Sequence, residues 1–367
     1  MYHIVHGMFH LYTDNKVVRK ISDLSKHDNA TFIYKKYPEF EERVSFYKNC
    51  EVKPFFFYIP YFQDKILRDC GGAFEDDTRI NLNIVREPKP PTIISDPVFY
   101  LDDAWGGNFH HWFWEYAPKI VRFLKLKEHI PNLKLLVNLK ILSQDELKQM
   151  LGRYADDVIY MDPYLEQSYS CHQLYIANPT SCWKSGYFAE DIRVELFKLF
   201  IDAFYDPSYE WTHNKVYISR YQNCLVHNAT RKVLNILEVH RFFEHFGYKP
   251  VFTDKITFRD RVNIFQRVTH ICCEHGGGAN HIFLTKEKVK MGIINFPNLE
   301  FNDHWLQYGK FNRDIIQLEN IGQYMEDRFV CKYPTVEPIN YKIQDASKPW
   351  CLDLYQLETA LKRYAFL

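Results

Sequence analysis

The second half of the sequence alternates short apolar runs with amphipathic stretches, and this alternation restricts the fold more than any other feature. The runs predicted as strands cover residues 216–219, 250–252, 268–273 and 290–296. The stretches predicted as helices cover residues 230–246, 258–266 and 279–284. Strands that alternate with helices form parallel sheets with helices on both faces. The second half is therefore predicted to be a doubly wound α/β domain.

The first half has a less regular pattern. Short apolar runs at residues 31–34 and 55–59 are interrupted by charged stretches, and the proline-rich residues 86–91 predict an extended connector. Ser143 and Glu146 have the spacing of a capping box at the start of a helix. These signals predict a mixed α/β region without fixing its sheet.

The domain boundary is predicted where a polar segment separates the two halves. We expect an N-terminal α/β domain over residues 1–210 and a Rossmann-like domain over residues 211–340. The spacing of apolar residues predicts a last helix at residues 354–366. Residues 341–367 are expected to carry this helix back to the first domain.

Composition excludes some classes of protein. The chain has 46 basic and 46 acidic residues, so it lacks the basic excess of a protein that binds nucleic acid by neutralising phosphates. No apolar stretch approaches the roughly 18–20 residues that span a bilayer. The N-terminal residues lack the pattern of a secretory signal. The sequence therefore predicts a cytoplasmic protein without a membrane span.

The sharpest functional signal is a glycine-rich turn between an apolar run and a predicted helix. It consists of Glu274, His275, Gly276, Gly277, Gly278, Ala279 and Asn280. Glycines let the backbone turn tightly and bring its N–H groups close to a ligand. The positive end of the following helix points at the same place. The turn is predicted to bind an anion, the alternative being a tight turn without a ligand.

Three other enzyme classes that share parts of this pattern are disfavoured. The turn His-Gly-Gly-Gly also forms the oxyanion hole of lipase-like hydrolases, which need a later G-x-S-x-G turn. The chain has no such turn, and Ser347 is the only serine after Gly278. No G-x-G-x-x-G follows a first strand, as a dinucleotide-dependent dehydrogenase requires. No Asp-x-Asp triplet is present to hold a diphosphate through a metal.

A second signal lies at the start of the second half. Arg220 follows an apolar run, and Arg231, Asn235 and Glu238 fall within about 60° on one face of the next predicted helix. Guanidinium groups suit a diphosphate, and Glu238 suits the hydroxyl groups of a ribose or sugar. The alternative is an internal Arg–Glu network at a domain surface.

A third signal lies in an aromatic-rich segment with helical spacing. His111 and Glu115 are four residues apart and share a helix face. A carboxylate raises the basicity of an imidazole, as a general base requires. The neighbouring Trp112, Phe113 and Tyr116 form either a wall on which a sugar stacks or part of the core. Neither an H-E-x-x-H motif nor a suitable third ligand supports a zinc site.

These three segments, in this order, resemble glycosyltransferase family 61, which includes plant xylosyl- and arabinosyltransferases and secretory-pathway protein O-GlcNAc transferases, with bacterial and viral relatives. Residues 108–118 look like its N-x-x-H-W-x-x-E-x-x-P block. Residues 217–239 are similar to its Y-I-S-R … R-x-x-x-N-E-x-E-V block, and residues 265–283 to its F-x-x-A-x-x-x-x-G-x-H-G-A-G-x-x-N segment. The resemblance covers about residues 105–300.

The sequence departs from the family pattern at three places. Ile236 stands where the family usually has a glutamate, which bears on sugar selection or activity. Glu274 directly precedes the histidine, without the common G-x-H approach. The glycine turn is one residue short if Asn280 is the family asparagine; otherwise His281 occupies that position.

The resemblance implies two facing Rossmann-like domains of the GT-B type, with a donor site in the second. It implies an inverting, metal-independent hexosyl- or pentosyltransferase that moves a sugar from a nucleotide diphosphate sugar, with a UDP-sugar favoured, to a hydroxyl of a glycan or protein. No cofactor besides the donor substrate is expected. The expected catalytic residues are His111 and Glu115, and the expected donor-binding residues are Arg220, Arg231, Asn235, Glu238, His275, Gly276, Gly277, Gly278 and Asn280. The alternative is a catalytically impaired relative that binds a glycan or nucleotide.

Overall fold

The computed structural model describes most of the chain in two compact units, Met1–Ala203 and Phe204–Leu367. The described residues are 11–12, 16–36, 41–54, 58–62, 65–67, 89–102, 107–164, 166–178, 181–182, 187–188, 190–221, 232–286, 288–295, 314–318, 321–324 and 350–367. The sequence places the division of the chain after residue 210.

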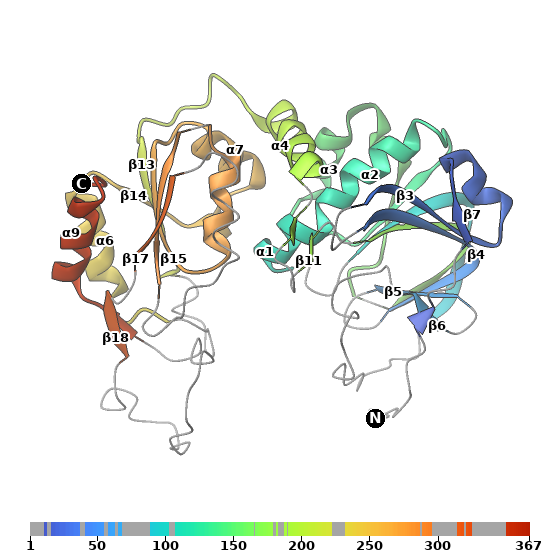
Figure 1. Ribbon diagram of the computed structural model, residues 1–367, viewed down its shortest axis with the longest axis horizontal. Helices are drawn as coiled ribbons and strands as arrows, with labels where there is room; N and C mark the ends of the chain where they lie inside the picture. Colours follow the sequence, from blue (N-terminus) through green and yellow to red (C-terminus); the bar gives the residue numbers. More distant parts are fainter. Residues whose placement is uncertain are drawn as a thin grey trace, which may run out of the picture. The chain divides into compact units, whose positions relative to one another are not determined.

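The described strands of the first unit form a ten-stranded sheet with a parallel part and an antiparallel part (Figure 1). The strands are β1 (Leu11–Tyr12), β2 (Lys16–Val18), β3 (Asn29–Lys36), β4 (Glu41–Pro54), β5 (Tyr58–Phe62), β6 (Lys65–Leu67), β7 (Lys89–Leu101), β8 (Lys134–Val137), β9 (Val158–Tyr160) and β10 (Gln167–Ala177). Their order is β1-β6-β5-β4-β10-β7-β8-β9, with β3 also pairing with β4 and β2 with β3. Strands β10, β7, β8 and β9 are parallel, whereas β4 pairs with β3, β5 and β10 in antiparallel fashion. Helices connect β7 to β8 and β8 to β9, which is compatible with a Rossmann-like fold, and the antiparallel part is an addition that the sequence did not predict.

Helices and a short ribbon complete the first unit. They are the 3₁₀ helix η1 (Ile21–Lys26), α1 (Phe109–His111), the π-helical turn η4 (Trp112–Tyr116), α2 (Pro118–Lys127), α3 (Gln144–Leu151), the 3₁₀ helix η5 (Gly152–Asp157), the ribbon β11 (Ser181–Cys182) with β12 (Tyr187–Phe188), and α4 (Glu190–Phe204). Helix α3 begins with the predicted capping box, because Ser143 and Glu146 each bond the other's backbone N–H. Phe123 of α2 packs against Phe99 of β7, with ring centroids 6.0 Å apart.

Residues 86–88 of the predicted connector lie outside the described residues, whereas Pro90 and Pro91 belong to the start of β7 and not to a connector. Strand β8 pairs only with the last part of β7, from Val98 onward. Proline lacks a backbone N–H and is tolerated where a strand has an unpaired edge. The short reach of β8 therefore explains why a proline-rich segment can begin a long strand.

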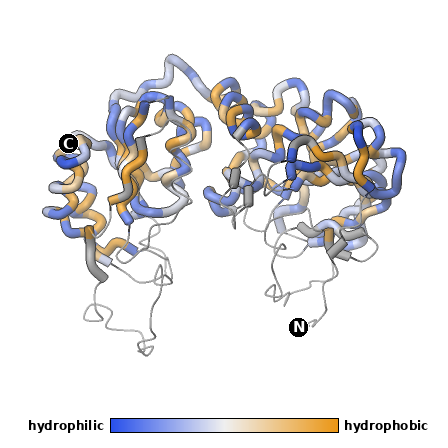
Figure 2. Tube along the Cα trace, viewed as in Figure 1, coloured by the Kyte–Doolittle hydropathy of each residue, from blue (hydrophilic) through white to orange (hydrophobic). Residues whose placement is uncertain are grey.

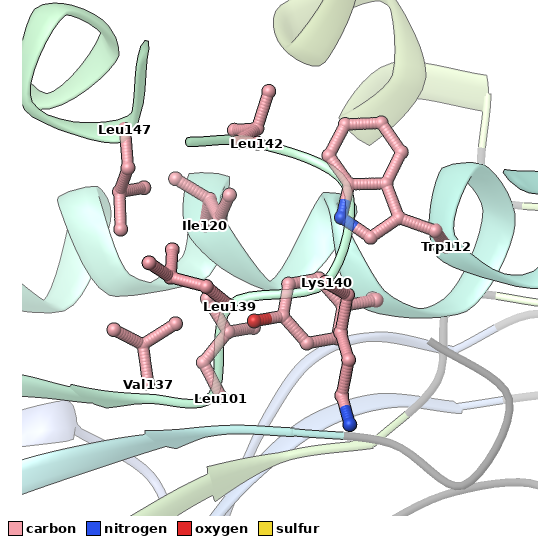
Figure 3. Close-up of a pocket in the computed structure, with 9 residues that line it drawn as sticks. Leu101, Trp112, Ile120, Val137, Leu139, Lys140, Leu142 and Leu147 are labelled. Carbon is pink, nitrogen blue, oxygen red and sulfur yellow. The ribbon is translucent and has the colours of Figure 1, made fainter. Parts of the chain in front are cut away.

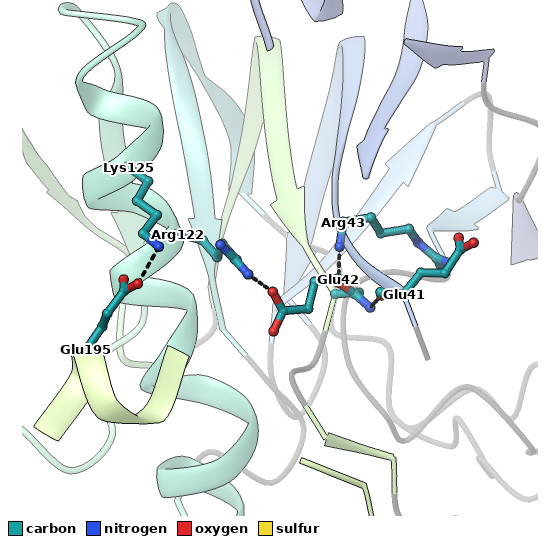
Figure 4. A network of polar contacts seen from close by, with 7 residues as sticks. Glu41, Glu42, Arg43, Arg122, Lys125 and Glu195 are labelled. Atoms are coloured by element: carbon teal, nitrogen blue, oxygen red, sulfur yellow. Dashed lines mark hydrogen bonds and ion pairs between the residues drawn. The ribbon is translucent and has the colours of Figure 1, made fainter. Parts of the chain in front are cut away.

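A buried ion pair joins helix α2 to the antiparallel part of the sheet (Figure 4). The guanidinium of Arg122 contacts the carboxylate of Glu42 on β4, and both side chains are buried. One turn along α2, Lys125 donates a hydrogen bond to Glu195 of α4 over 2.7 Å. Removing one partner of a buried pair typically costs about 3–5 kcal/mol, so this contact fixes α2 against the sheet.

The second unit contains a fully parallel sheet of five described strands in the order β14-β13-β15-β16-β17. The strands are β13 (Lys215–Ile218), β14 (Lys249–Val251), β15 (His270–Glu274), β16 (Lys290–Ile294) and β17 (Asp314–Leu318). Helices α6 (Ile236–His245) and α9 (Leu354–Arg363) lie on one side of the sheet, and α7 (Phe258–Phe265) lies on the other (Figure 1). The remaining elements are the 3₁₀ helices η6 (Thr253–Lys255) and η7 (Gly277–Leu284) and the ribbon β18 (Gly322–Tyr324) with β19 (Trp350–Leu352). This architecture confirms the doubly wound prediction.

Apolar residues run along the strands of this sheet (Figure 2). Val216, Ile271, Met291 and Ile293 are fully buried. Strands covered on both faces read as continuous apolar runs, which is why the sequence located them.

Helix α9 packs on the second unit, whereas it was expected to return to the first domain; residues 341–349 of that expectation lie outside the described residues. Its Leu357 and Leu361 are buried in the same cluster as Phe243 of α6. The carbonyl oxygen of Phe366 also accepts a hydrogen bond from the hydroxyl of Tyr248, over 3.0 Å. The apolar stripe of α9 is thus covered by its own sheet.

None of the described helices combines the length and the apolar character required to cross a lipid bilayer.

Candidate functional site

The order of strands in the second unit reverses between β13 and β15, and several predicted site residues follow these two strands. Open parallel sheets bind ligands at such a reversal, beside the carboxyl ends of the strands. Arg220 lies just beyond β13, and His275 directly follows β15. Nη1 of Arg220 donates a hydrogen bond to the carbonyl oxygen of His275 over 2.9 Å. The structure therefore brings together two of the predicted donor-binding residues.

The glycines after His275 meet specific backbone requirements. Gly276 has a φ of 145°, a conformation that side chains other than hydrogen rarely permit. A Cβ atom on Gly278 would lie 3.2 Å from Cγ2 of Ile218. Helix η7 starts at Gly277, and the first N–H groups of a helix have no acceptor within it. The turn can therefore present backbone donors to an anion.

The imidazole of His275 is held from the neighbouring strand. Its Nδ1 lies 3.2 Å from Oδ1 of Asn295, which directly follows β16, and its backbone N–H donates to the carbonyl oxygen of Ile294 over 2.8 Å. Asn295 was not predicted, although its place after an apolar run puts it at the same edge of the sheet. The strand was predicted over residues 290–296, which includes Asn295, whereas β16 ends at Ile294; the later predicted end of the strand is why Asn295 was missed.

A second contact missed from sequence fixes the end of β13. Nε2 of His240 on α6 lies 2.6 Å from Oγ of Ser219, which also accepts a hydrogen bond from the N–H of Tyr221 over 3.0 Å. Burial lowers the pKa of His240, against an opposing effect of Glu244, so the neutral ring accepts the Ser219 proton. This arrangement holds the backbone on both sides of Arg220.

Glu274 is a buried carboxylate at the end of β15. The hydroxyl of Tyr217 on β13 donates a hydrogen bond to its Oε1. Burial raises the pKa of Glu274 to about 6, although the Tyr217 hydroxyl, its own backbone N–H and the positive charge of Arg220 oppose this shift. The structure thus places an ionisable group at the first position of the glycine turn.

Asn280 and His281, the two candidates for the family asparagine, are both buried within η7. Nδ1 of His281 lies 2.8 Å from the carbonyl oxygen of Gly278, and its ring packs against Phe265 of α7, with centroids 4.6 Å apart. Burial lowers the pKa of His281 to about 3, helped by the charge of Arg261. The neutral ring therefore donates to Gly278 and holds the first turn of η7.

In the first unit, His111 and Glu115 are in contact as predicted. Nδ1 of His111 lies 3.1 Å from Oε1 of Glu115, and the His111 side chain is 24% exposed while that of Glu115 is 2% exposed. Asn108 caps α1 by accepting a hydrogen bond from the N–H of His110 over 2.9 Å. The pair thus offers an imidazole near the surface that a buried carboxylate orients.

The pair spans a widened helical turn. The N–H of Ala117 donates to the carbonyl oxygen of Trp112, five residues back, over 2.7 Å. Pro118 follows, and proline neither donates to the carbonyl four residues before it nor fits against that carbonyl in a regular helix. Such π-helical turns are frequent at functional sites.

The aromatic residues around this pair belong to the core. Trp112 stacks on Phe200 of α4 with centroids 5.9 Å apart and an interplanar angle of 15°. Phe113 contacts the same ring, and Tyr116 is buried too. Of the two interpretations of these residues, the structure favours the core: Trp112 and Phe113 pack on α4, and the buried Tyr116 stacks on Trp112.

The arrangement so far combines a histidine–glutamate pair at a helix start, an arginine behind a strand and a glycine turn at a reversal of strand order. The family described as Glycosyltransferase 61 matches residues 109–292, just over half of the chain. The chain belongs to glycosyltransferase family 61. No curated protein matches the sequence. The matched segment includes His111, Glu115, Arg220 and the complete glycine turn.

One departure of this family 61 member, Ile236, and its neighbour Asn235 have structural roles at the start of helix α6. Ile236, at the usual place of a glutamate, is buried in the cluster that covers the sheet. Nδ2 of Asn235 donates to the carbonyl oxygen of Leu352 over 2.9 Å, and its Oδ1 accepts from the N–H of the same residue over 3.0 Å. Asn235 therefore joins α6 to β19. Glu238 is exposed in the first turn of α6, and Arg231 lies outside the described residues.

The family 61 chain also carries a polar cluster at the carboxyl ends of β7 and β8. Asp102 is fully buried, accepts a hydrogen bond from Nδ2 of Asn138 over 2.9 Å and pairs with Lys140 at 3.3 Å. Beside it lies an apolar cavity of about 10 Å³, room for at most one water molecule. In Figure 3 the amine of Lys140 points away from Leu147 on the far side of this cavity. The cavity is too small for a sugar.

Across the described part of the family 61 chain, no three His, Cys, Asp or Glu side chains are grouped so that they could hold a metal ion.

Proposed function

We propose that this family 61 member transfers a sugar from a nucleotide diphosphate sugar, a UDP-sugar, to a hydroxyl group of a glycan or protein. We propose inversion at the anomeric carbon, without a metal and without a cofactor besides the donor. Family membership supports the class of reaction. The contact between Arg220 and the glycine turn, at the reversal of strand order, is the observation that supports the donor site.

In this proposal the second unit binds the diphosphate. Arg220 supplies a guanidinium, and the turn from Gly276 to Gly278 supplies backbone N–H groups at the start of η7. His275, held by Asn295, lies at the start of the same turn. These groups stabilise the charge that develops on the leaving diphosphate, which is the usual way in which such sites lower a barrier. Arg231, Glu238 and Asn280 stay proposed donor-binding residues, and the contacts of Asn235 favour a structural role for it.

His111 is the proposed general base. Its Nδ1 donates to the carboxylate of Glu115, which leaves Nε2 as the nitrogen that takes the proton of the acceptor hydroxyl. Glu115 is a positioning residue that stabilises the imidazolium once it forms. The exposure of His111 and the burial of Glu115 suit this division of roles. The GT-B arrangement of the two units stays a prediction from the family resemblance.

The second candidate is a relative that binds a nucleotide or glycan without turnover. Ile236 favours it, because a buried apolar side chain stands where the family usually has a glutamate. The two candidates agree on donor binding and differ in whether the bound donor is consumed.

A thermal-shift screen with UDP-, GDP-, CMP- and dTDP-sugars tests donor binding, since a specific ligand raises the melting temperature by mass action. We expect UDP-sugars to give the largest shift, followed by slow release of nucleotide. A shift without release supports the impaired relative. The absence of a shift with every donor contradicts the proposal.

A further inference from the structure

Glu274 combines deep burial with incomplete hydrogen bonding. Its side chain lies at the end of β15, 2% exposed, and Oε1 accepts a hydrogen bond from the hydroxyl of Tyr217. Oε2 is buried and has no hydrogen-bond partner among the described residues. A carboxylate in such a place is costly, because burial removes the water that stabilises its charge.

The groups around Glu274 offset little of the cost of burying its negative charge. The titratable or charged groups on the packed elements are Tyr217 and Arg220 of the β13 segment, Cys272 and Cys273 of β15, His275 directly after β15, and His240 of α6. Burial raises the pKa of both cysteines and lowers that of His240, so these groups are neutral near pH 7. Ile294, the partner of Glu274 on β16, is apolar. Arg220 is the one cation of the described residues that acts on Glu274.

The positive charge of Arg220 therefore interacts with two negative groups, the Glu274 carboxylate and, in the proposed complex, the diphosphate. Without a donor, its guanidinium partly offsets the negative charge of Glu274 while Nη1 bonds the carbonyl oxygen of His275. A diphosphate bound at the glycine turn draws on the same guanidinium and places further negative charge next to Glu274. Like charges in a buried site raise the pKa of a carboxyl group. Binding of the diphosphate thus favours the neutral acid.

We propose that Glu274 is a positioning residue that takes up one proton from solvent when the diphosphate of the donor binds at the glycine turn. The inference rests on the proposed function. As a carboxylate, Glu274 holds Arg220 in the free protein; as a carboxylic acid, it leaves Arg220 to the diphosphate. By linkage, protonation of Glu274 strengthens donor binding by the same factor by which the donor favours protonation.

Isothermal titration calorimetry with UDP-glucose measures the proton directly. The diphosphate of UDP-glucose has both ends esterified and no group that titrates near pH 7. Titrations at pH 7 in two buffers with different ionisation enthalpies give the number of protons bound per donor. We expect about half to one proton for the wild-type chain, because a group with a pKa of about 6 is mostly ionised at this pH.

Two variants and a control make this test specific. Glu274→Gln keeps an oxygen for Tyr217 and has no titration, so its proton uptake is expected to be close to zero. Tyr217→Phe removes the hydrogen bond that favours the carboxylate, so Glu274 is protonated beforehand and the uptake decreases. Glu244→Gln, a substitution of an exposed residue on α6, is expected to take up as many protons as the wild type.

The outcomes separate this inference from the proposed function. Binding of UDP-glucose without proton uptake, or with the full uptake retained in Glu274→Gln, overturns the inference and leaves the donor site standing. If neither UDP-glucose nor any other nucleotide sugar of the screen binds, the proposed function fails and the inference fails with it.

Discussion

The candidate site residues include one buried glutamate in each unit, and the two glutamates differ in which group contacts the carboxylate. Glu115 in the first unit contacts the imidazole of His111 across one helical turn, and Trp112 of the same turn stacks on Phe200 of α4. Glu274 in the second unit contacts a tyrosine hydroxyl and shares the charge of Arg220. The first glutamate orients one reactive side chain, whereas the second adjusts a site made largely of backbone.

The two regions therefore differ in how strongly a single substitution affects the proposed chemistry or the donor binding. In the first unit, the proposed chemistry depends on one imidazole, so a single substitution removes it. In the second unit, an arginine, a helix start and glycine backbone contribute together, so each substitution removes part of the binding. Predictions that compare the two regions should therefore separate turnover from donor affinity.

The largest expected effect comes from the first region. His111→Ala removes the proposed general base and is expected to lower the transfer rate by about 10²–10⁴-fold, the usual contribution of such a group. The dissociation constant of the donor should not change. Rate measurements at saturating donor, together with calorimetry, test this separation. His110→Ala, at the neighbouring position, should keep its activity; full activity of His111→Ala removes that residue from the mechanism.

In the second region, Arg220→Ala is expected to weaken donor binding by about 10–150-fold, since hydrogen bonds to charged groups contribute about 1.5–3 kcal/mol. The donor affinity of Arg220→Lys should lie between those of the wild type and Arg220→Ala, because an ammonium keeps the charge and loses the planar fork of the guanidinium. Arg241→Ala, an exposed change on α6, serves as the control in calorimetry. An unchanged dissociation constant in Arg220→Ala would contradict the donor site.

The glycine turn gives a smaller effect on stability and binding together. Gly276→Ala forces a residue with a Cβ atom into a φ of 145°, at a cost of about 1–3 kcal/mol. Urea unfolding and donor affinity should both decline. Gly107→Ala provides the matched change, because its added methyl group meets no atom within 4 Å. Equal effects of the two substitutions would show that the turn carries no strain.

The smallest effect depends on pH. Glu274 has a pKa of about 6 in the folded state against an ordinary value of 4.5, so the folded state binds more protons and its stability decreases as pH rises through this interval. Above it, Glu274→Gln should raise the free energy of unfolding by up to about 2 kcal/mol, at about 1.4 kcal/mol per pKa unit. At pH 4 the gain should vanish. Urea unfolding at pH 4 and pH 8 measures this difference, and an equal gain at both values would refute it.

Much of the second unit was predictable because its strands are buried on both faces. The runs at residues 216–219 and 268–273 correspond to β13 and β15, and the glycine triplet marked the turn between β15 and η7. The antiparallel part of the first unit was not predictable in the same way. Strand β4 begins with the charged residues Glu41, Glu42 and Arg43, which do not form the apolar run that predicts a strand from sequence.

Side-chain partners were the least accessible part of the site. Asn235 shares a helix face with Glu238, yet the face alone does not show that β19 engages its amide. The contact of Ser219 with His240 likewise depends on how α6 lies over the sheet. The contact of His111 with Glu115 was predictable, because both partners belong to one helical segment.

A crystal structure of the chain with UDP-glucose bound tests the central claim most directly. The account predicts oxygens of the diphosphate within about 3 Å of backbone N–H groups between Gly276 and Gly278 and of the Arg220 guanidinium. A diphosphate bound elsewhere, with the glycine turn empty and Arg220 directed away from the ligand, would contradict it.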